Sequence, residues 1–268
     1  MNDAPAPDRL HFFLGGRDLE MQAIRALLQD HAPGRFSDGG LAWGAAASAY
    51  IDKIRESLGR GETPVLIELA DDLPDGAFDR SRCLVVDHHG ALAGRGRPTS
   101  LEQVFALLGL PRSAWTREHE LVAANDRGHI RAMQALDPPA TAAEIGSIRD
   151  RDRRAQGISD ADEAEAARAV AQREAKGRLT ILTTTGRSST AAADLMEPVL
   201  GGPGYDALLV AMPETLAVFA DGGTVRWLAD RVPGSWFGGD LPMRGFWGAR
   251  LPPGPERDRL LAELGNRF

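Results

Sequence analysis

The ten residues "CLVVDHHGAL", at positions 83 to 92, decide how the chain is interpreted. The apolar run Cys83–Val86 stops abruptly at Asp87, His88 and His89, and a glycine follows. A continuous apolar run of this length is typical of a strand that is covered on both faces. Polar groups at the end of such a strand do not help packing. Because the chain has six histidines in all, two adjacent ones here indicate a functional site.

The amino-acid composition indicates an ordinary globular protein and excludes some classes of partner. The chain has 268 residues, of which 43% are hydrophobic and 26% charged, as in ordinary globular proteins. Its net charge of −7 excludes a global attraction for nucleic acid or an anionic membrane. Cys83 is the one cysteine, so no disulfide forms within the chain. No signal peptide and no run of about 18 apolar residues is recognisable. We therefore expect a cytoplasmic protein without a membrane partner.

Strands and helices alternate in the first half of the chain. Apolar runs predict strands at 10–14, 64–70 and 83–87. Helical spacing and caps predict helices at 18–31, 40–59, 99–111 and 118–136, with Ser100 and Gln103 as a capping box. Strands that are apolar throughout and alternate with helices favour an α/β fold, a parallel sheet flanked by helices.

The amino-acid composition of the chain changes after residue 137. The stretch 138–177 is highly charged and Ala-rich, which predicts a helical connector between an N-terminal domain, 1–137, and a smaller C-terminal α/β domain, 178–268. A substrate-facing basic strip in this stretch is the alternative; its members would be Arg149, Arg151, Arg153 and Arg154. In the last domain, a hairpin is expected around Asp221, between apolar runs at 215–223 and 224–230.

Acidic and imidazole side chains follow the predicted strands of the first domain. They are Asp18, Glu20, Asp71, Asp72, Asp87, His88 and His89, and Asp126 comes further on. Ligands of open parallel sheets bind beyond the carboxyl ends of the strands, where these groups could converge. Clustered carboxylates repel one another unless a cation joins them. A mixed carboxylate and imidazole set suits Mn²⁺, and suits Zn²⁺ and Fe²⁺ less well. A pair of such metals lowers the pKa of a bridging water and holds phosphoryl oxygens.

Taken alone, most of these acids have a simpler explanation. Asp18 is a good cap for the helix that follows it. Asp71 and Asp72 precede Leu-Pro and fit a turn. Asp126, before Arg-Gly, fits a turn or a cap. The adjacent histidines have no such simple structural role.

Together, the motifs resemble those of the DHH phosphoesterase superfamily. The matching stretches are "VVDHHG" (85–90), the acidic pair near the N-terminus and "NDRG" (125–128). That family includes single-strand-specific exonucleases, oligoribonucleases, cyclic-dinucleotide phosphodiesterases, exopolyphosphatases and manganese-dependent pyrophosphatases. The stretch "WFGGDLPMRGFWG" (236–248) resembles the glycine-rich substrate loop of the domain that often follows.

The resemblance implies a role for each matching residue. It implies metal ligands at Asp18, Glu20, Asp71 or Asp72 (as the bridging ligand), His88 and Asp126. It further implies that His89 faces the phosphate and that Asp87 orients the triplet. In the substrate loop the implied residues are Gly238, Gly239, Asp240 and Arg244. The implied cofactor is Mn²⁺, with Mg²⁺ or another divalent metal left open.

The chain also departs from the family pattern. Leu14 stands where the first motif usually has a metal-binding histidine, Glu20 replaces an aspartate, and Asp240 replaces the histidine of the substrate loop. Two functions stay open. One is a metal-dependent phosphoesterase, and the other is a catalytically impaired relative that binds a nucleotide or phosphate ligand as a sensor or subunit.

The expected partner is small. The acidic net charge argues against long nucleic acid. A small phosphorylated molecule or a very short oligonucleotide is favoured, and a homo-oligomer is left open.

Overall fold

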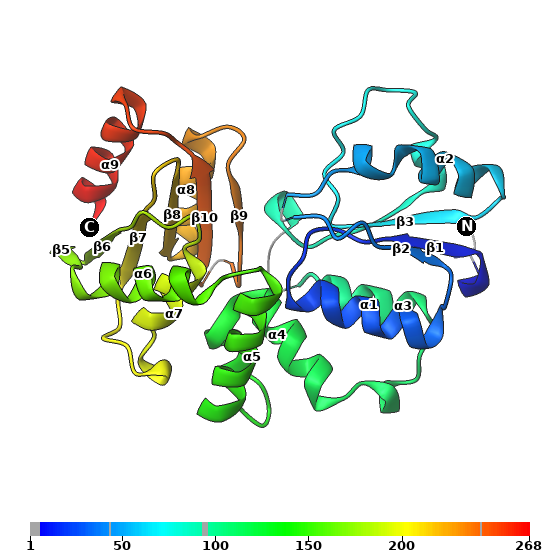
Figure 1. Ribbon diagram of the computed structural model, residues 1–268, viewed down its shortest axis with the longest axis horizontal. Helices are drawn as coiled ribbons and strands as arrows, with labels where there is room; N and C mark the ends of the chain where they lie inside the picture. Colours follow the sequence, from blue (N-terminus) through cyan, green and yellow to red (C-terminus); the bar gives the residue numbers. More distant parts are fainter. Residues whose placement is uncertain (1–5, 43, 93–95, 242) are drawn as a thin grey trace. The chain divides into compact units, whose positions relative to one another are not determined.

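The chain forms two compact units. The structure, a computed structural model, describes residues 6–42, 44–92, 96–241 and 243–268. The first unit consists of the residues up to His88 together with Gly96–Asp126 (Figure 1). The second contains the short segment that begins at His89, and Arg127–Phe268. The charged stretch 138–177, expected as a connector, lies within the second unit.

A four-stranded parallel sheet is the centre of the first unit, and the expected α/β class is confirmed. Its strands, in spatial order, are β2 (Phe36–Ser37), β1 (Leu10–Phe13), β3 (Thr63–Ile67) and β4 (Leu84–Val86). Phe12 and Val65, paired across β1 and β3, are fully buried. Each side chain of this size contributes about 1.5–3 kcal/mol on burial. Because the four strands are parallel, their carboxyl ends all lie at the same edge of the sheet.

Helices cover both faces of this sheet. In Figure 1, α1 (Leu19–His31) and α3 (Ser100–Leu107) lie on one face and α2 (Ile51–Gly59) on the other. The α2 face packs a cluster that includes Phe13, Ile54 and Leu66. Part of the predicted helix at 40–59 is instead a 3₁₀ turn, Ala47–Tyr50, ahead of α2; position 43 lies outside the described residues.

Side-chain caps fix where two of these helices begin. Asp18 accepts a hydrogen bond from the Met21 amide at 2.7 Å and caps α1, as expected of an aspartate at that position. The capping box of α3 is one residue earlier than predicted, and joins Thr99 to Glu102. This shift puts Ser100 inside the first turn of α3.

The second unit is built on a mixed six-stranded sheet. Its strands, in spatial order, are β5 (Glu174–Lys176), β6 (Leu179–Thr183), β7 (Ala207–Ala211), β8 (Thr215–Ala220), β10 (Gly245–Arg250) and β9 (Trp236–Gly238). The β6–β7 pair is parallel and the other neighbours are antiparallel. β7 is buried along its whole length.

Helices also cover both faces of the second sheet. Residues of α8 (Gly222–Arg231) and α9 (Pro255–Arg267) pack against one face, and residues of α6 (Asp160–Ala171) and α7 (Thr190–Met196) against the other (Figure 1). The hairpin predicted around Asp221 is wrong. Asp221 instead accepts a hydrogen bond from the Thr224 amide and caps α8. The segment 224–230, expected as a strand, is therefore helical.

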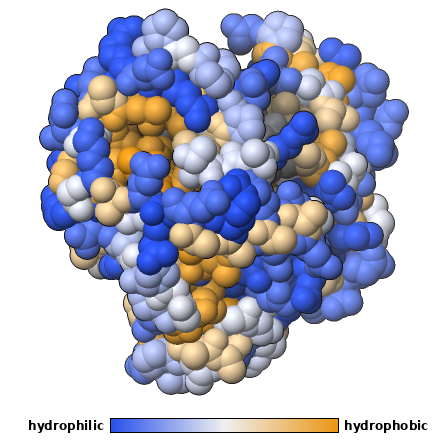
Figure 2. Space-filling view, turned by 60° about the vertical axis from the view of Figure 1, so that its left-hand side comes forward, coloured by the Kyte–Doolittle hydropathy of each residue, from blue (hydrophilic) through white to orange (hydrophobic). Residues whose placement is uncertain are grey.

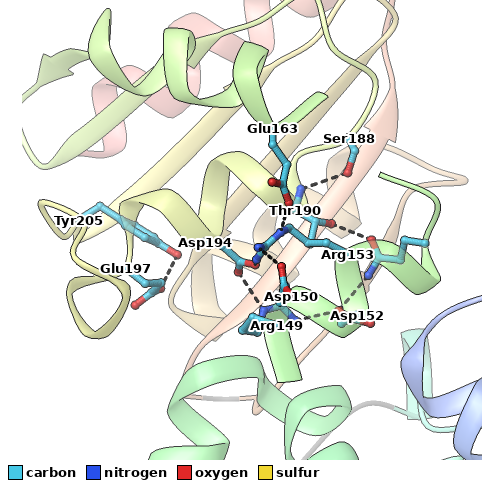
Figure 3. Close-up of polar contacts among 11 residues, drawn as sticks. Arg149, Asp150, Asp152, Arg153, Glu163, Ser188, Thr190, Asp194, Glu197 and Tyr205 are labelled. Carbon is cyan, nitrogen blue, oxygen red and sulfur yellow. Dashed lines mark hydrogen bonds and ion pairs between the residues drawn. The ribbon is translucent and has the colours of Figure 1, made fainter. Parts of the chain in front are cut away.

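An ion-pair network ties α5 (Ala142–Ala155) to α6 and α7 (Figure 3). Arg149, 1% exposed, donates to Asp152 at 2.8 Å and to Asp194 at 2.9 Å. Arg153 donates to Asp194 and to Glu163, each at 2.8 Å. These two arginines hold the helices together, so neither belongs to a substrate-facing basic strip.

Helix α4 (Arg117–Gln134) is broken where the chain leaves the first unit. Gly128 and His129 have non-helical backbone angles, and φ of His129 is +54°. A non-glycine residue in this region of φ and ψ is strained. Short 3₁₀ turns complete the fold at Pro7–Arg9, Arg80–Arg82, Gly90–Leu92, Arg112–Ala114 and Pro198–Leu200.

The surface shown in Figure 2 is mainly hydrophilic, with smaller hydrophobic areas between the hydrophilic residues. In the described part of the chain, the large hydrophobic side chains that are exposed are Val85, Leu92, Leu195 and Met243. Within the same part, no helix combines the length and the hydropathy needed to span a membrane.

Candidate metal centre

The carboxyl ends of β3 and β4 bring Glu68 and His88 to one edge of the first sheet. The Glu68 amide donates to the Val86 carbonyl at 2.9 Å, which extends the ladder one residue beyond β3. Glu68 has φ of +48°, in the left-handed region. Strained backbone of this kind concentrates at functional sites.

Gly15 lets the end of β1 lie against Glu68. A Cβ atom at Gly15 would be 2.6 Å from the Ile67 carbonyl oxygen and 2.8 Å from that of Glu68. Any side chain here would push the two strand ends apart. The glycine that closes the first strand thus helps to place the acidic residues that follow it.

His88 is surrounded by three carboxylates. Its Nε2 lies 2.5 Å from Oδ2 of Asp126, 3.5 Å from Oε1 of Glu68 and 3.6 Å from Oε2 of Glu20. The side chains of His88 and Glu20 are 7% and 0% exposed. Ligand atoms of Glu68, His88 and Asp126 all lie within 4.8 Å of one another. We call Glu20, Glu68, His88 and Asp126 the acidic cluster.

The buried charges change one another's protonation. Burial raises the pKa of Glu20 to about 8, and the charge of Asp126 adds to this. Burial and the charge of Glu68 likewise raise the pKa of Asp18 well above its usual value. Burial opposes the charged form of His88, but the carboxylates, Asp126 first, outweigh it and raise its pKa. These shifts show that three carboxylates crowd one imidazole.

The acidic cluster fits a divalent cation. Oε2 of Glu20 is buried and, among the residues that the structure describes, accepts no hydrogen bond. A buried carboxylate oxygen that accepts no hydrogen bond has a large desolvation cost. Carboxylate oxygens with one imidazole are a donor set for Mn²⁺ and related ions. A cation among them would offset the repulsion and complete the contacts of Glu20.

Two of the expected ligands lie elsewhere. Asp71 is exposed and accepts from Arg80 at 2.6 and 2.8 Å. Asp72 is also exposed and accepts from the amide and hydroxyl of Ser48 at 3.0 and 2.6 Å. The structure does not bring either residue to the acidic cluster, because β3 ends at Ile67 and the next residue, Glu68, takes the place expected of them.

Glu68 was missed in the sequence although it carried a signal. It is the single charged residue in the apolar run that we expected to continue as a strand to residue 70. Asp18, the other N-terminal acid, serves as the cap of α1. Leu14 is fully buried, and its carbonyl accepts from the Tyr50 hydroxyl at 2.9 Å. Position 14 thus contributes to packing and offers no side-chain ligand.

Asp87 and His89 flank His88 on either side. The carbonyl of Asp87 accepts from Arg97 at 3.1 Å and from Gln103 at 3.3 Å, which fixes the chain just before His88. His89 begins the second unit, where a Cβ atom added to Gly238 would lie 3.3 Å from its ring. Gly238 therefore leaves room for His89.

The predicted substrate loop borders a pocket of the second unit. Gly239 has φ of +107° and lies close to Gly245. A Cβ atom added to Gly239 would be 2.7 Å from the Cα atom of Gly245. Arg244 lies over the ring of Tyr205, at 4.5 Å from its centroid, and donates to the Asp206 carbonyl. The backbone carbonyl of Asp240 accepts from the amides of Met243 and Arg244. The pocket is lined by Gly128, His129, Ile130, Arg131, Ala193, Asp194, Glu197, Tyr205, Phe219, Gly239, Arg244, Gly245 and Phe246.

Among the comparisons with known proteins, the one with solved structures gives matches. No protein-family model and no curated protein matches the sequence. The exonuclease RecJ bound to manganese has a TM-score of 0.43 at 12% identity, over 99% of this chain and 92% of that one. RecJ from Thermus thermophilus in complex with Mn²⁺ has a TM-score of 0.47 at 13% identity, over 99% of this chain and 53% of that one.

A third solved structure is the pGpG-specific phosphodiesterase PggH from Vibrio cholerae. It has a TM-score of 0.41 at 11% identity, over 96% of this chain and 98% of that one. The chain is similar to these proteins.

Proposed function

We propose that the chain is a metal-dependent phosphoesterase that acts on a small phosphorylated molecule, a nucleotide or a very short oligonucleotide. One observation carries the proposal. Glu20, Glu68, His88 and Asp126 converge in the first unit, and a buried oxygen of Glu20 there accepts no hydrogen bond from the described residues. The DHH-like motif supports the same reaction class.

The acidic cluster has the groups that this chemistry needs. Mn²⁺, or Mg²⁺ in its place, would be held by the three carboxylates and His88, and would act as a Lewis acid toward a phosphoryl oxygen and an attacking water. Oδ2 of Asp126 and Nε2 of His88 lie 2.5 Å apart, so both would face the same metal position. We propose that His89 binds the phosphate and that Asp87 keeps the triplet in position.

We further propose that the pocket of the second unit binds part of the substrate. Arg244 and Tyr205 offer a cationic plane stacked on an aromatic ring. Such a pair suits an anionic or planar group. Gly239 allows the close backbone approach that the loop needs.

The test is hydrolysis of a panel of phosphomonoesters, nucleotides and dinucleotides with and without Mn²⁺. His88→Ala and Asp126→Ala should each abolish Mn²⁺-dependent turnover, because each removes a ligand. His11→Ala is the matched control, since His11 is a partly buried histidine of the same unit that contacts Ser37 and Glu62 instead. Undiminished turnover in either cluster variant would contradict the proposal.

The second candidate is a ligand-binding protein without turnover. Leu14 favours it, because the buried leucine removes a ligand that the family uses. Calorimetric titration of Mn²⁺ into metal-free protein, combined with the substrate panel, separates the two functions. Metal binding with hydrolysis supports the enzyme. Metal or nucleotide binding without hydrolysis of any substrate supports the sensor or subunit.

A further inference from the structure

The first turn of α3 contacts two members of the acidic cluster. The hydroxyl of Ser100 donates to Oε1 of Glu68 at 2.7 Å. The amide of the next residue, Leu101, donates to Oε1 of Glu20 at 2.9 Å. Ser100 and Leu101 are both fully buried. One helix turn therefore holds two carboxylates from different elements, since Glu68 follows β3 and Glu20 lies in the first turn of α1.

These contacts have the strength and rigidity to orient the carboxylates. Hydrogen bonds to a carboxylate are stronger than those between neutral groups, and the end of a helix adds its positive potential. The capping box of Thr99 and Glu102 fixes the turn from which they come. With Oε1 of Glu20 held by Leu101, the other oxygen, Oε2, lies 3.6 Å from Nε2 of His88.

We propose that Ser100 is a positioning residue, which sets the divalent-metal affinity of the acidic cluster by orienting Glu68. Glu68 sits in a left-handed backbone conformation, with its side chain 11% exposed. Without the hydroxyl of Ser100, its carboxylate has more freedom to turn away from His88. The inference rests on the proposed metal site and adds to it a residue that is not itself a ligand.

Ser100→Ala tests the proposal in full-length, metal-free protein titrated with Mn²⁺ in a calorimeter. Loss of a group that orients a ligand typically weakens metal binding about 10- to 100-fold, and we expect that increase in Kd. Ser57→Ala is the matched control. Ser57 is also fully buried and its hydroxyl donates to a glutamate, Glu62, which is not in the acidic cluster. Its Kd should equal that of the wild type.

Ser100→Gly provides a second variant in case the alanine variant does not fold. It also lacks the hydroxyl, so Kd should again increase. Circular dichroism of the metal-free proteins verifies folding. A wild-type Kd in folded Ser100→Ala or Ser100→Gly would overturn the inference and leave the metal site standing. If wild-type protein binds no Mn²⁺, the proposed function fails, and this inference with it.

Discussion

Glu20 is a buried carboxylate whose protonation depends on its neighbours. In the metal-free protein its pKa is about 8, against about 4.5 in the unfolded chain. The folded state therefore binds more protons than the unfolded state between these values. By linkage, the contribution of Glu20 to the free energy of unfolding is complete below pH 4.5, and it is lost as pH rises through about 8.

Glu20→Gln should remove this dependence. Its side-chain oxygen can still accept from Leu101, and it stays neutral at every pH. Relative to the metal-free wild type, we expect the variant to gain free energy of unfolding as pH rises from about 5 to about 8. Urea unfolding at a series of pH values measures the difference. Parallel curves for the two proteins would contradict the buried, raised pKa of Glu20.

At the residue scale, the sequence predicts three of the four residues of the acidic cluster and misses Glu68. Glu20, His88 and Asp126 were expected and come together. Asp71 and Asp72 were expected as well, but the end of β3 decides which acid reaches the edge of the sheet. β3 ends three residues before the predicted strand does, which places Glu68 at that edge, and apolar patterning does not define strand ends that closely.

The network of α5, α6 and α7 is the clearest element-scale source of stability in the second unit. Asp194 on α7 accepts from Arg149 and Arg153, both on α5, and Glu163 on α6 accepts from Arg153. Without Arg149, the buried carboxylate of Asp152 loses its arginine, and Asp194 keeps only Arg153 of its two arginines. Arg149→Met should therefore lower the free energy of unfolding by about 3–5 kcal/mol.

Arg154→Met is the control for that prediction. Arg154 also lies on α5 and pairs with Asp150, but its side chain is 71% exposed. Its loss should change the free energy of unfolding by less than about 1 kcal/mol. Urea unfolding measures both variants. Equal effects would show that burial of Arg149 does not matter.

Helix and strand types were predictable where several signals agreed. Apolar runs predicted β1, β3 and β4, and polar caps predicted the first residues of α1 and α3 to within one position, whereas α3 ends four residues before its predicted end. The error at Asp221 has a local cause. Asp-Gly-Gly between apolar runs suits both a hairpin turn and a helix cap. The buried Val225, Leu228 and Val232 follow helical spacing, which decides for the cap.

At the scale of the whole molecule, the acidic cluster belongs to one unit. All four of its residues lie in the first unit. A bound metal should therefore stabilise this unit directly. At a free concentration of 100 times its Kd, a ligand of the folded state adds about 2.7 kcal/mol.

Hydrogen exchange followed by mass spectrometry locates that stabilisation. Mn²⁺ should slow exchange in β1, β3, α1 and α3, and removal of the metal with EDTA should restore it. β6 and β7 in the second unit serve as the internal reference. A metal centre built from the first unit alone would be contradicted by either of two results. One is that Mn²⁺ does not slow hydrogen exchange in the first unit, and the other is that it slows exchange equally in both sheets.

The boundary between the units runs through the two adjacent histidines. His88 belongs to the first unit and His89 to the second, and the chain returns to the first unit at Gly96. Neither unit is one continuous piece of sequence, so recombination at a single point cannot exchange one of them whole. A gene fragment ending at residue 126 would still encode a strip of the other unit.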